Sequence, residues 1–205
     1  CGKAQFEILS EPKQTAASML ENRIISGSRV RVHNARQPLV SIQMKFIEPI
    51  SHICSGVLIH PLFVLSSAHC FEANAPARYY KLLFGLQGMR SISIGEENGS
   101  YTKYQVRYAQ YINAYPNHLY FDFQYPDNDV DRVNKLALIE LNAPVMLNSN
   151  VWPACLPHLS ETIQSGRQCL VAGYGETRGS GYPLSLKQAI QTIKSPSECR
   201  SMYSN

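Results

Sequence analysis

A histidine followed directly by a cysteine is the clearest chemical feature of this 205-residue sequence. His69 and Cys70 end the segment Ser-Ser-Ala-His-Cys at residues 66–70, which follows the apolar run Phe63–Leu65. A neutral imidazole can accept a proton during catalysis, and its protonated form can return it. A single histidine is more often structural than catalytic, so His69 taken alone supports only the structural interpretation.

Six cysteines are scattered along the chain, at Cys1, Cys54, Cys70, Cys155, Cys169 and Cys199. None forms a Cys-x-x-Cys pair, which argues against a zinc or thioredoxin-like site, and we expect no metal and no cofactor. Scattered cysteines in even number indicate disulfides and an oxidising compartment. Asn98 begins an Asn-Gly-Ser glycosylation acceptor, although a chance triplet in a turn would read the same. We therefore expect a secreted, disulfide-bonded glycoprotein.

Charge and hydrophobicity exclude other classes of protein. The net charge is +4, and no dense block of Lys and Arg indicates nucleic-acid binding. No apolar run approaches the roughly 18 residues that a membrane-spanning helix needs. The chain opens on Cys1 with neither an initiator Met nor a signal peptide, so we expect a processed piece of a longer precursor.

Short apolar runs punctuated by Gly, Pro, Asn or Ser dominate from Ile24 onward. They predict strands at residues 39–44, 56–59, 63–65, 81–84, 91–94, 136–141 and 169–172. Many closely spaced short strands are typical of an all-β sandwich or barrel. One helix is predicted after Ser195, because this N-cap residue precedes a Pro and is followed three positions later by Glu198. Residues 1–23 differ from the rest, and their polar segment 11–22, which carries no strand alternation, is interpreted as an extended or loosely ordered leader.

Several motifs, in one order along the chain, resemble those of the trypsin/chymotrypsin family of serine proteases. The matching segments are residues 23–27, 37–43, 54–59, 66–70, 136–141, 152–157 and 169–175. The resemblance implies two antiparallel six-stranded β-barrels, the first at about residues 24–140 and the second from about residue 152, incomplete in this chain. It also implies serine-type endopeptidase chemistry, in which a Ser attacks, a His takes its proton and a buried Asp orients the His. His69 fills the base position.

The same resemblance implies processing and two disulfides. Arg23 and Ile24 resemble a zymogen activation site that an activating trypsin-like protease cleaves. Residues 1–23 would then remain as a light chain, tethered to the protease domain 24–205 by a Cys1–Cys155 disulfide. A second disulfide, Cys54–Cys70, would clamp the loop that carries His69. Cys169 and Cys199 have their usual partners later in the family, so they either pair unusually or pair with absent sequence.

Two departures from the family bear on activity. The family's Asp-Ile-Ala-Leu motif places the Asp two residues before Ala137, where this chain has Lys135. Lysine carries donors only, so it can neither accept the His N–H nor stabilise an imidazolium. Asp131 is the nearest upstream acid and is expected to be a solvated turn residue. The family's Gly-Asp-Ser-Gly-Gly motif, with the nucleophile and the oxyanion hole, would follow Asn205, so substrate specificity cannot be read from this chain.

Aromatic residues crowd the middle of the chain, at Tyr101, Tyr104, Tyr108, Tyr111, Tyr115, Tyr120, Phe121, Phe123 and Tyr125. In the family, the loop matching residues 119–133 overhangs the substrate cleft, and here it looks longer than the family minimum. Tyr and Phe are good contact anchors, so Tyr120, Phe121, Phe123 and Tyr125 are candidate binding residues. The alternative, local packing on strands, applies most to residues 101–111.

The leading hypothesis is a secreted serine protease homologue without catalytic activity, a pseudoenzyme that binds proteins or regulates a proteolytic cascade. The alternative is an active serine endopeptidase whose nucleophile lies beyond residue 205. An inhibitor or carrier built on the same fold is a third class that the sequence does not separate from the first. Expected partners are proteins or peptides at the cleft-side loops, an activating protease, and a C-terminal chain of the same precursor.

Overall fold

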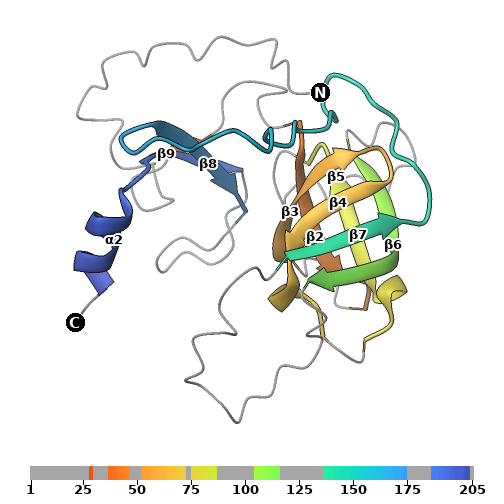
Figure 1. The fold of residues 1–205 in the computed structure, drawn as a ribbon. Helices are drawn as coiled ribbons and strands as arrows, with labels where there is room; N and C mark the ends of the chain where they lie inside the picture. Colours follow the sequence, from red (N-terminus) through yellow and green to blue (C-terminus); the bar gives the residue numbers. More distant parts are fainter. Residues whose placement is uncertain are drawn as a thin grey trace.

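The computed structural model describes residues 28–29, 37–46, 52–72, 75–86, 104–115, 136–174 and 186–203. Two β units lie side by side in this part of the chain, a closed barrel and a smaller sheet (Figure 1). Helical structure within it is limited to two short 3-10 turns and one short α-helix. These features confirm the predicted all-β class of the double-barrel type, with a partial second unit.

Six antiparallel strands close the barrel in the order β2-β3-β4-β7-β6-β5. Their bounds are β2 Leu39–Met44, β3 His52–His60, β4 Phe63–Ser67, β5 Tyr80–Phe84, β6 Gln105–Tyr115 and β7 Leu136–Leu141. Successive side chains on a strand point to opposite faces, and on β4 and β7 every second residue is buried. Val64 and Ile139 are fully buried in this way, together with Val40, Ile42, Leu58 and Leu82. These apolar side chains form the barrel core.

The smaller sheet has the order β1-β9-β8, with β1 at Ser28–Arg29, β8 at Gln168–Gly173 and β9 at Lys187–Thr192. Ser28 pairs with Gln188, so the chain contributes a strand to this sheet before it enters the barrel. Leu170, Val171 and Ile190 expose two-fifths to one-half of their surface. Within the described residues, no layer covers these apolar side chains, which fits a partial barrel.

The helix α2, Pro196–Tyr203, begins where the sequence predicts it. The Ser195 N–H donates to a Glu198 carboxylate oxygen at 2.8 Å, and the Glu198 N–H donates to Ser195 Oγ at 3.2 Å. These reciprocal bonds form a capping box. The bond from the Ser195 backbone is the main cause that lowers the pKa of Glu198.

A small apolar core joins the two units. Tyr174, which follows β8, is buried and donates its hydroxyl to the carbonyl of Leu86, which follows β5. Burial raises the pKa of Tyr174, so its hydroxyl stays protonated as a donor. Leu83, Tyr104 and Leu186 pack in the same cluster. The second sheet is therefore attached to the barrel by buried contacts as well as by the chain itself.

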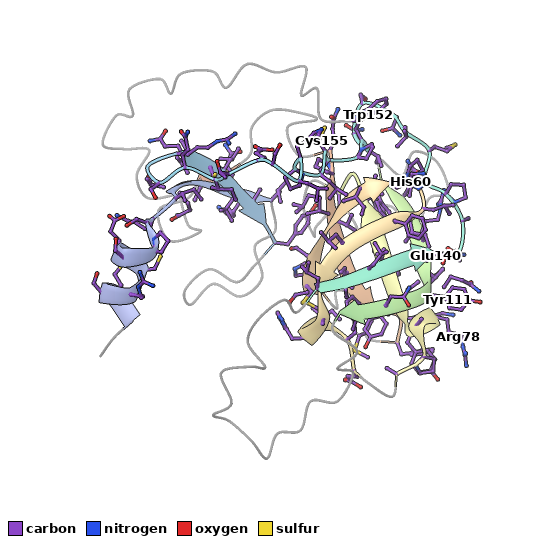
Figure 2. All side chains as sticks on the ribbon, in the orientation of Figure 1. His60, Arg78, Tyr111, Glu140, Trp152 and Cys155 are labelled. Carbon is purple, nitrogen blue, oxygen red and sulfur yellow. A yellow bond between two sulfur atoms is a disulfide. The ribbon has the colours of Figure 1, made fainter. Side chains whose placement is uncertain are left out.

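The segment that leaves the barrel after β7 is fixed to it by backbone hydrogen bonds. The Trp152 N–H donates to the Gln37 carbonyl at 3.3 Å, and the Ala154 N–H donates to the Leu58 carbonyl at 2.8 Å. Figure 2 shows Trp152 and Cys155 on this segment, where it passes from the barrel toward the second sheet. Cys155 thus lies at the crossover between the two units.

Candidate active site around His69

The end of strand β4 presents His69 to solvent. The strand ends at Ser67 and continues directly into the 3-10 turn η2, Ala68–Cys70. Ala68 is buried beneath the turn, whereas His69 is exposed. Ser67 pairs with Leu136, the first residue of β7, so the histidine turn lies beside the start of that strand.

A disulfide and a side-chain hydrogen bond hold the turn against β3. Cys54 of β3 and Cys70 form the disulfide that the family resemblance implied, with their Cα atoms 6.0 Å apart. Ser66 Oγ donates to the Ser55 carbonyl on the same strand at 3.0 Å. The backbone on both sides of His69 is therefore fixed to β3.

Buried aromatic contacts fix the residues that follow the histidine. Phe71 is 3% exposed and packs edge-to-face on Tyr80, with ring centroids 4.9 Å apart. The Glu72 N–H donates to the Tyr80 hydroxyl at 2.8 Å. Burial is the main cause that raises the pKa of Tyr80, which keeps this hydroxyl neutral. His69 therefore lies on a turn that is restrained before and after it.

Both ring nitrogens of His69 have side-chain neighbours. Nδ1 lies 2.7 Å from Ser67 Oγ, and Nε2 lies 3.8 Å from Cys70 Sγ. Within the described residues, no carboxylate is hydrogen-bonded to either nitrogen. Sequence reasoning missed Ser67, although a hydroxyl two positions before the histidine was a visible signal in the motif.

Three potential metal ligands meet at this turn, but they do not make a metal site. The ligand atoms of Cys54, His69 and Cys70 lie within 4.8 Å of one another. The two sulfur atoms are bonded to each other, so neither is a thiolate able to bind a metal. The imidazole is the only remaining ligand of the three.

The other predicted site residues lie mainly outside the described residues. These are Cys1, Arg23, Ile24, Asn98, Lys135, Tyr120, Phe121, Phe123 and Tyr125. Lys135 directly precedes Leu136, the residue paired with Ser67. Cys155 is disulfide-bonded and exposed, and its pairing with Cys1 stays a prediction. Cys169 and Cys199 are free thiols.

Comparisons with known proteins agree with this geometry. The family model described as Trypsin matches residues 24–205. Trypsin of Sus scrofa is 32% identical over 155 residues, which cover 75% of this chain and 57% of that protein. The chain thus spans little more than half the length of this relative.

Solved structures show the same fold at lower identity. Human heparin binding protein matches with a TM-score of 0.66 and 24% identity, over 86% of this chain and 68% of that chain. A protein named GrC matches over the same shares, with a TM-score of 0.66 and 21% identity.

The barrel, the disulfide-clamped histidine turn and the partial second sheet together define a serine-protease-type domain. With the family model covering residues 24–205, the chain belongs to the trypsin family. No helix in the described part of the chain is long and apolar enough to cross a membrane.

Proposed function

We propose that this chain belongs to a secreted, non-catalytic trypsin-family protein that binds other proteins or regulates a proteolytic cascade. The observation that carries the proposal is Lys135, which occupies the position of the family's catalytic aspartate. It directly precedes strand β7, whose first residue pairs with Ser67, two residues before His69. A cation is therefore encoded where the mechanism needs an anion.

The chemistry of that position explains the expected loss of activity. In the family mechanism, the aspartate accepts the Nδ1–H of the histidine and stabilises the imidazolium that forms. A lysine ammonium group has three donors and no acceptor, and its positive charge opposes an imidazolium. In the described residues, the neighbour of His69 Nδ1 is the neutral hydroxyl of Ser67. A neutral group supplies no charge to stabilise the imidazolium.

Retention of the scaffold supports a binding role. The chain keeps the barrel core, the Cys54–Cys70 disulfide and the junction around Tyr174. The proposed loss of catalytic activity therefore concerns the catalytic residues more than the fold. The aromatic segment with Tyr120, Phe121, Phe123 and Tyr125 offers contact anchors for a protein or peptide partner. A disulfide and an Asn98 acceptor fit secretion.

We further propose that a trypsin-like protease cleaves after Arg23 and that a Cys1–Cys155 disulfide keeps residues 1–23 attached as a light chain. The exposed, disulfide-bonded Cys155 at the crossover between the units supports this arrangement. A light chain could then be released only after reduction.

An active endopeptidase is the second candidate function. It is favoured by the retained His69 on a restrained turn and by 32% identity to a trypsin. It requires a nucleophilic Ser outside these 205 residues and another carboxylate, Asp131 being the first candidate, to serve His69.

Peptide hydrolysis by the full-length protein, after cleavage at Arg23, separates the two candidates. We expect little or no turnover from the unmodified protein. If the full-length protein has the Ser of the Gly-Asp-Ser-Gly-Gly motif, Lys135→Asp should raise kcat by several orders of magnitude. The ceiling is the factor of about 10⁴ that this carboxylate contributes in the family's reference enzyme.

The matched control is Lys135→Asn, which removes the positive charge but supplies no carboxylate. Normal protease rates from the unmodified protein, with no gain from Lys135→Asp, would falsify the proposal. Activity that survives His69→Ala would come from a contaminating protease, and such a preparation would be rejected.

A further inference from the structure

A cluster of three aromatic rings and two cations lies where the end of β2 meets the start of β5. Lys45 and Phe46 follow β2, Arg78 and Tyr79 belong to the 3-10 turn η3, Ala77–Tyr79, and Tyr108 lies on β6. These five side chains are called the cation–aromatic patch below. Figure 2 shows Arg78 on the side of the barrel that faces away from β8 and β9.

The rings and cations of the patch contact one another. Lys45 Nζ lies 5.8 Å from the ring centroid of Phe46 and 5.3 Å from that of Tyr108. The Arg78 guanidinium carbon lies 5.6 Å from the Tyr79 ring centroid, and the Tyr79 ring meets that of Phe46 edge-to-face at 4.9 Å. A cation within about 6 Å of a ring centroid is attracted to the ring. The five side chains therefore form one connected surface.

Backbone hydrogen bonds fix the segments that carry this surface. The Lys45 N–H donates to the Tyr79 carbonyl at 2.8 Å, which ties the residue after β2 to the end of η3. The Tyr108 N–H donates to the side-chain oxygen of Asn142 at 3.0 Å, and the Tyr108 carbonyl accepts the Asn142 N–H at 2.9 Å. A surface whose backbone is already ordered loses little conformational entropy when a partner binds.

The positive charge of the patch has no carboxylate partner. Lys45 and Arg78 are both exposed, and neither forms an ion pair within the described part of the chain. The aromatic rings carry no net charge, so both cations keep their charge for a ligand. Phe46, which contacts Lys45 directly and Arg78 through Tyr79, is 66% exposed. The patch thus offers positive charge and an exposed apolar ring together.

This combination fits a ligand that carries carboxylates next to an apolar side chain. Aromatic residues and arginine are the anchors that protein interfaces favour. A polyanionic chain, such as a sulfated polysaccharide or a nucleic acid, is instead bound by dense rows of Lys and Arg, and the sequence has no such block. An acidic protein segment therefore matches the patch better than a polyanion does.

We propose that the cation–aromatic patch binds an acidic segment of a partner protein. Carboxylates of that segment pair with Lys45 and Arg78, and an apolar side chain beside them packs on Phe46. The patch includes neither His69 nor the aromatic segment 119–133. The inference therefore goes beyond the proposed function, and it holds for a catalytically active protein as well as for an inactive one.

Fluorescence anisotropy of labelled peptides, titrated with the full-length protein, tests this proposal. The probe is the end-blocked peptide Gly-Glu-Phe-Glu-Asp-Leu-Gly. Its control is the same peptide with Gln and Asn in place of Glu and Asp, which keeps the shape and removes the charge. We expect the acidic peptide to bind with a Kd below about 1 mM and the neutral peptide to bind about tenfold more weakly.

Variants of the patch locate the binding site on the protein. Lys45→Gln and Arg78→Gln should each weaken the acidic peptide about threefold, as expected for one exposed ion pair, and Phe46→Ala about fivefold. Arg200→Gln is the matched control, because it removes an equal charge from an exposed arginine of α2, and it should leave the affinity unchanged. All four side chains are exposed, and an unchanged urea midpoint verifies that each variant is folded.

Several results would overturn the inference. They are a Kd of the acidic peptide above about 1 mM, equal binding of the two peptides, and an equal loss of affinity in Arg200→Gln and the patch variants. Heparin serves as a further probe, because it is strongly anionic and has no apolar side chain. Heparin binding that Lys45→Gln and Arg78→Gln weaken, without binding of the acidic peptide, would assign the patch to a polysaccharide instead. Peptide hydrolysis by the protein would refute the proposed function and leave these binding results as they are.

Discussion

At the scale of single residues, His52 is a second histidine whose surroundings determine its charge. It lies on β3, is 6% exposed, and its Nδ1 is 2.9 Å from Ser41 Oγ. Its ring packs against Tyr174 at the junction, with centroids 5.4 Å apart. Burial lowers the pKa of His52 from 6.5 to about 4. The folded protein therefore keeps this ring neutral at pH values where an unfolded chain protonates it.

This difference predicts a loss of stability in mild acid. Between pH 6.5 and about 4, the unfolded state binds the His52 proton and the folded state does not, so the free energy of unfolding falls as the pH falls. The pKa difference amounts to about 3 kcal/mol at pH 4. Urea unfolding at pH 7, 5.5 and 4 measures this slope, and His52→Gln should flatten it.

The control for this experiment is His60→Gln, because His60 is exposed. It removes an imidazole from the surface of the barrel, and its pH slope is compared with that of His52→Gln. Equal slopes in the unmodified protein and in His52→Gln would show that His52 does not cause the acid sensitivity.

His69 and His52 show which functional residues a sequence motif can predict and which it cannot. His69 and the Cys54–Cys70 disulfide beside it were predicted from motifs that resemble those of the family. Ser67 and His52 were not, because their roles depend on a rotamer and on burial, which residue types alone do not reveal. Lys135 was singled out by the resemblance to the family's Asp-Ile-Ala-Leu motif, and it lies outside the described residues.

At the scale of elements, Gly56 of β3 leaves room for the side chain of Val64 on the neighbouring strand β4. It is buried and pairs with Val40 of β2. A Cβ atom at this position would lie 2.7 Å from Val64 Cγ1 and 3.3 Å from the Leu65 carbonyl oxygen. Val64 is β-branched and fully buried, so it has little freedom to move away. The glycine is therefore required by space.

Gly56→Ala should lower the free energy of unfolding by about 1–3 kcal/mol, the usual cost of overpacking a core. Denaturant unfolding measures the change. Ser55→Ala is the matched control, because the neighbouring side chain is exposed and its loss should cost less than about 0.5 kcal/mol. Equal effects of the two substitutions would contradict the steric argument.

The strands differ in how well the sequence predicted them. The bounds of β2 and β7 agree with the prediction, because both are short runs whose alternate apolar side chains face the barrel core. β9, with the sequence Lys-Gln-Ala-Ile-Gln-Thr, was missed because only Ala189 of it is buried and the rest looks like a polar loop.

The strand β6 was anticipated only as the alternative of local packing on strands for residues 101–111, and its bounds were not predicted. Its polar residues hold the neighbouring segment through side-chain bonds, such as that of Arg107 to the Pro144 carbonyl at 2.8 Å. The alternation of apolar residues is therefore weak. Tyr104 is buried and Tyr108 half-buried, which favours local packing for these two tyrosines, while Tyr111 remains 58% exposed.

At the scale of the whole molecule, Tyr174 connects the two β units. It packs with Leu86, Leu83 and Leu186, and its hydroxyl bonds to the Leu86 carbonyl. The junction is small compared with the barrel core, so a single large side chain supplies much of its buried surface.

Tyr174→Ala should cost about 3–5 kcal/mol, as for other large aromatic side chains truncated in a core. It should also uncouple the units, so that amides of β8 and β9 exchange hydrogen faster than those of β4 and β7. Tyr174→Phe should cost about 1–3 kcal/mol, since the Leu86 carbonyl loses its donor. Native-state hydrogen exchange measures both effects.

Tyr111→Ala is the control for the junction, because Tyr111 is exposed on β6. It should change exchange in neither unit beyond its own strand. If Tyr174→Ala slowed or left unchanged the exchange of β8 and β9 relative to the barrel, the junction would not be the link between the units.

The pairing of β1 with β9 sets the order in which this molecule can assemble during synthesis. All six barrel strands lie between residues 39 and 141, so every one of them is made before β8 and β9 exist. Ser28 is made earlier still, yet its partner Gln188 follows 160 residues later in the sequence. Closing so long a loop is slow and costly in entropy. Until β9 has been made, β1 therefore has no partner strand in this sheet, whereas all six strands of the barrel are already present.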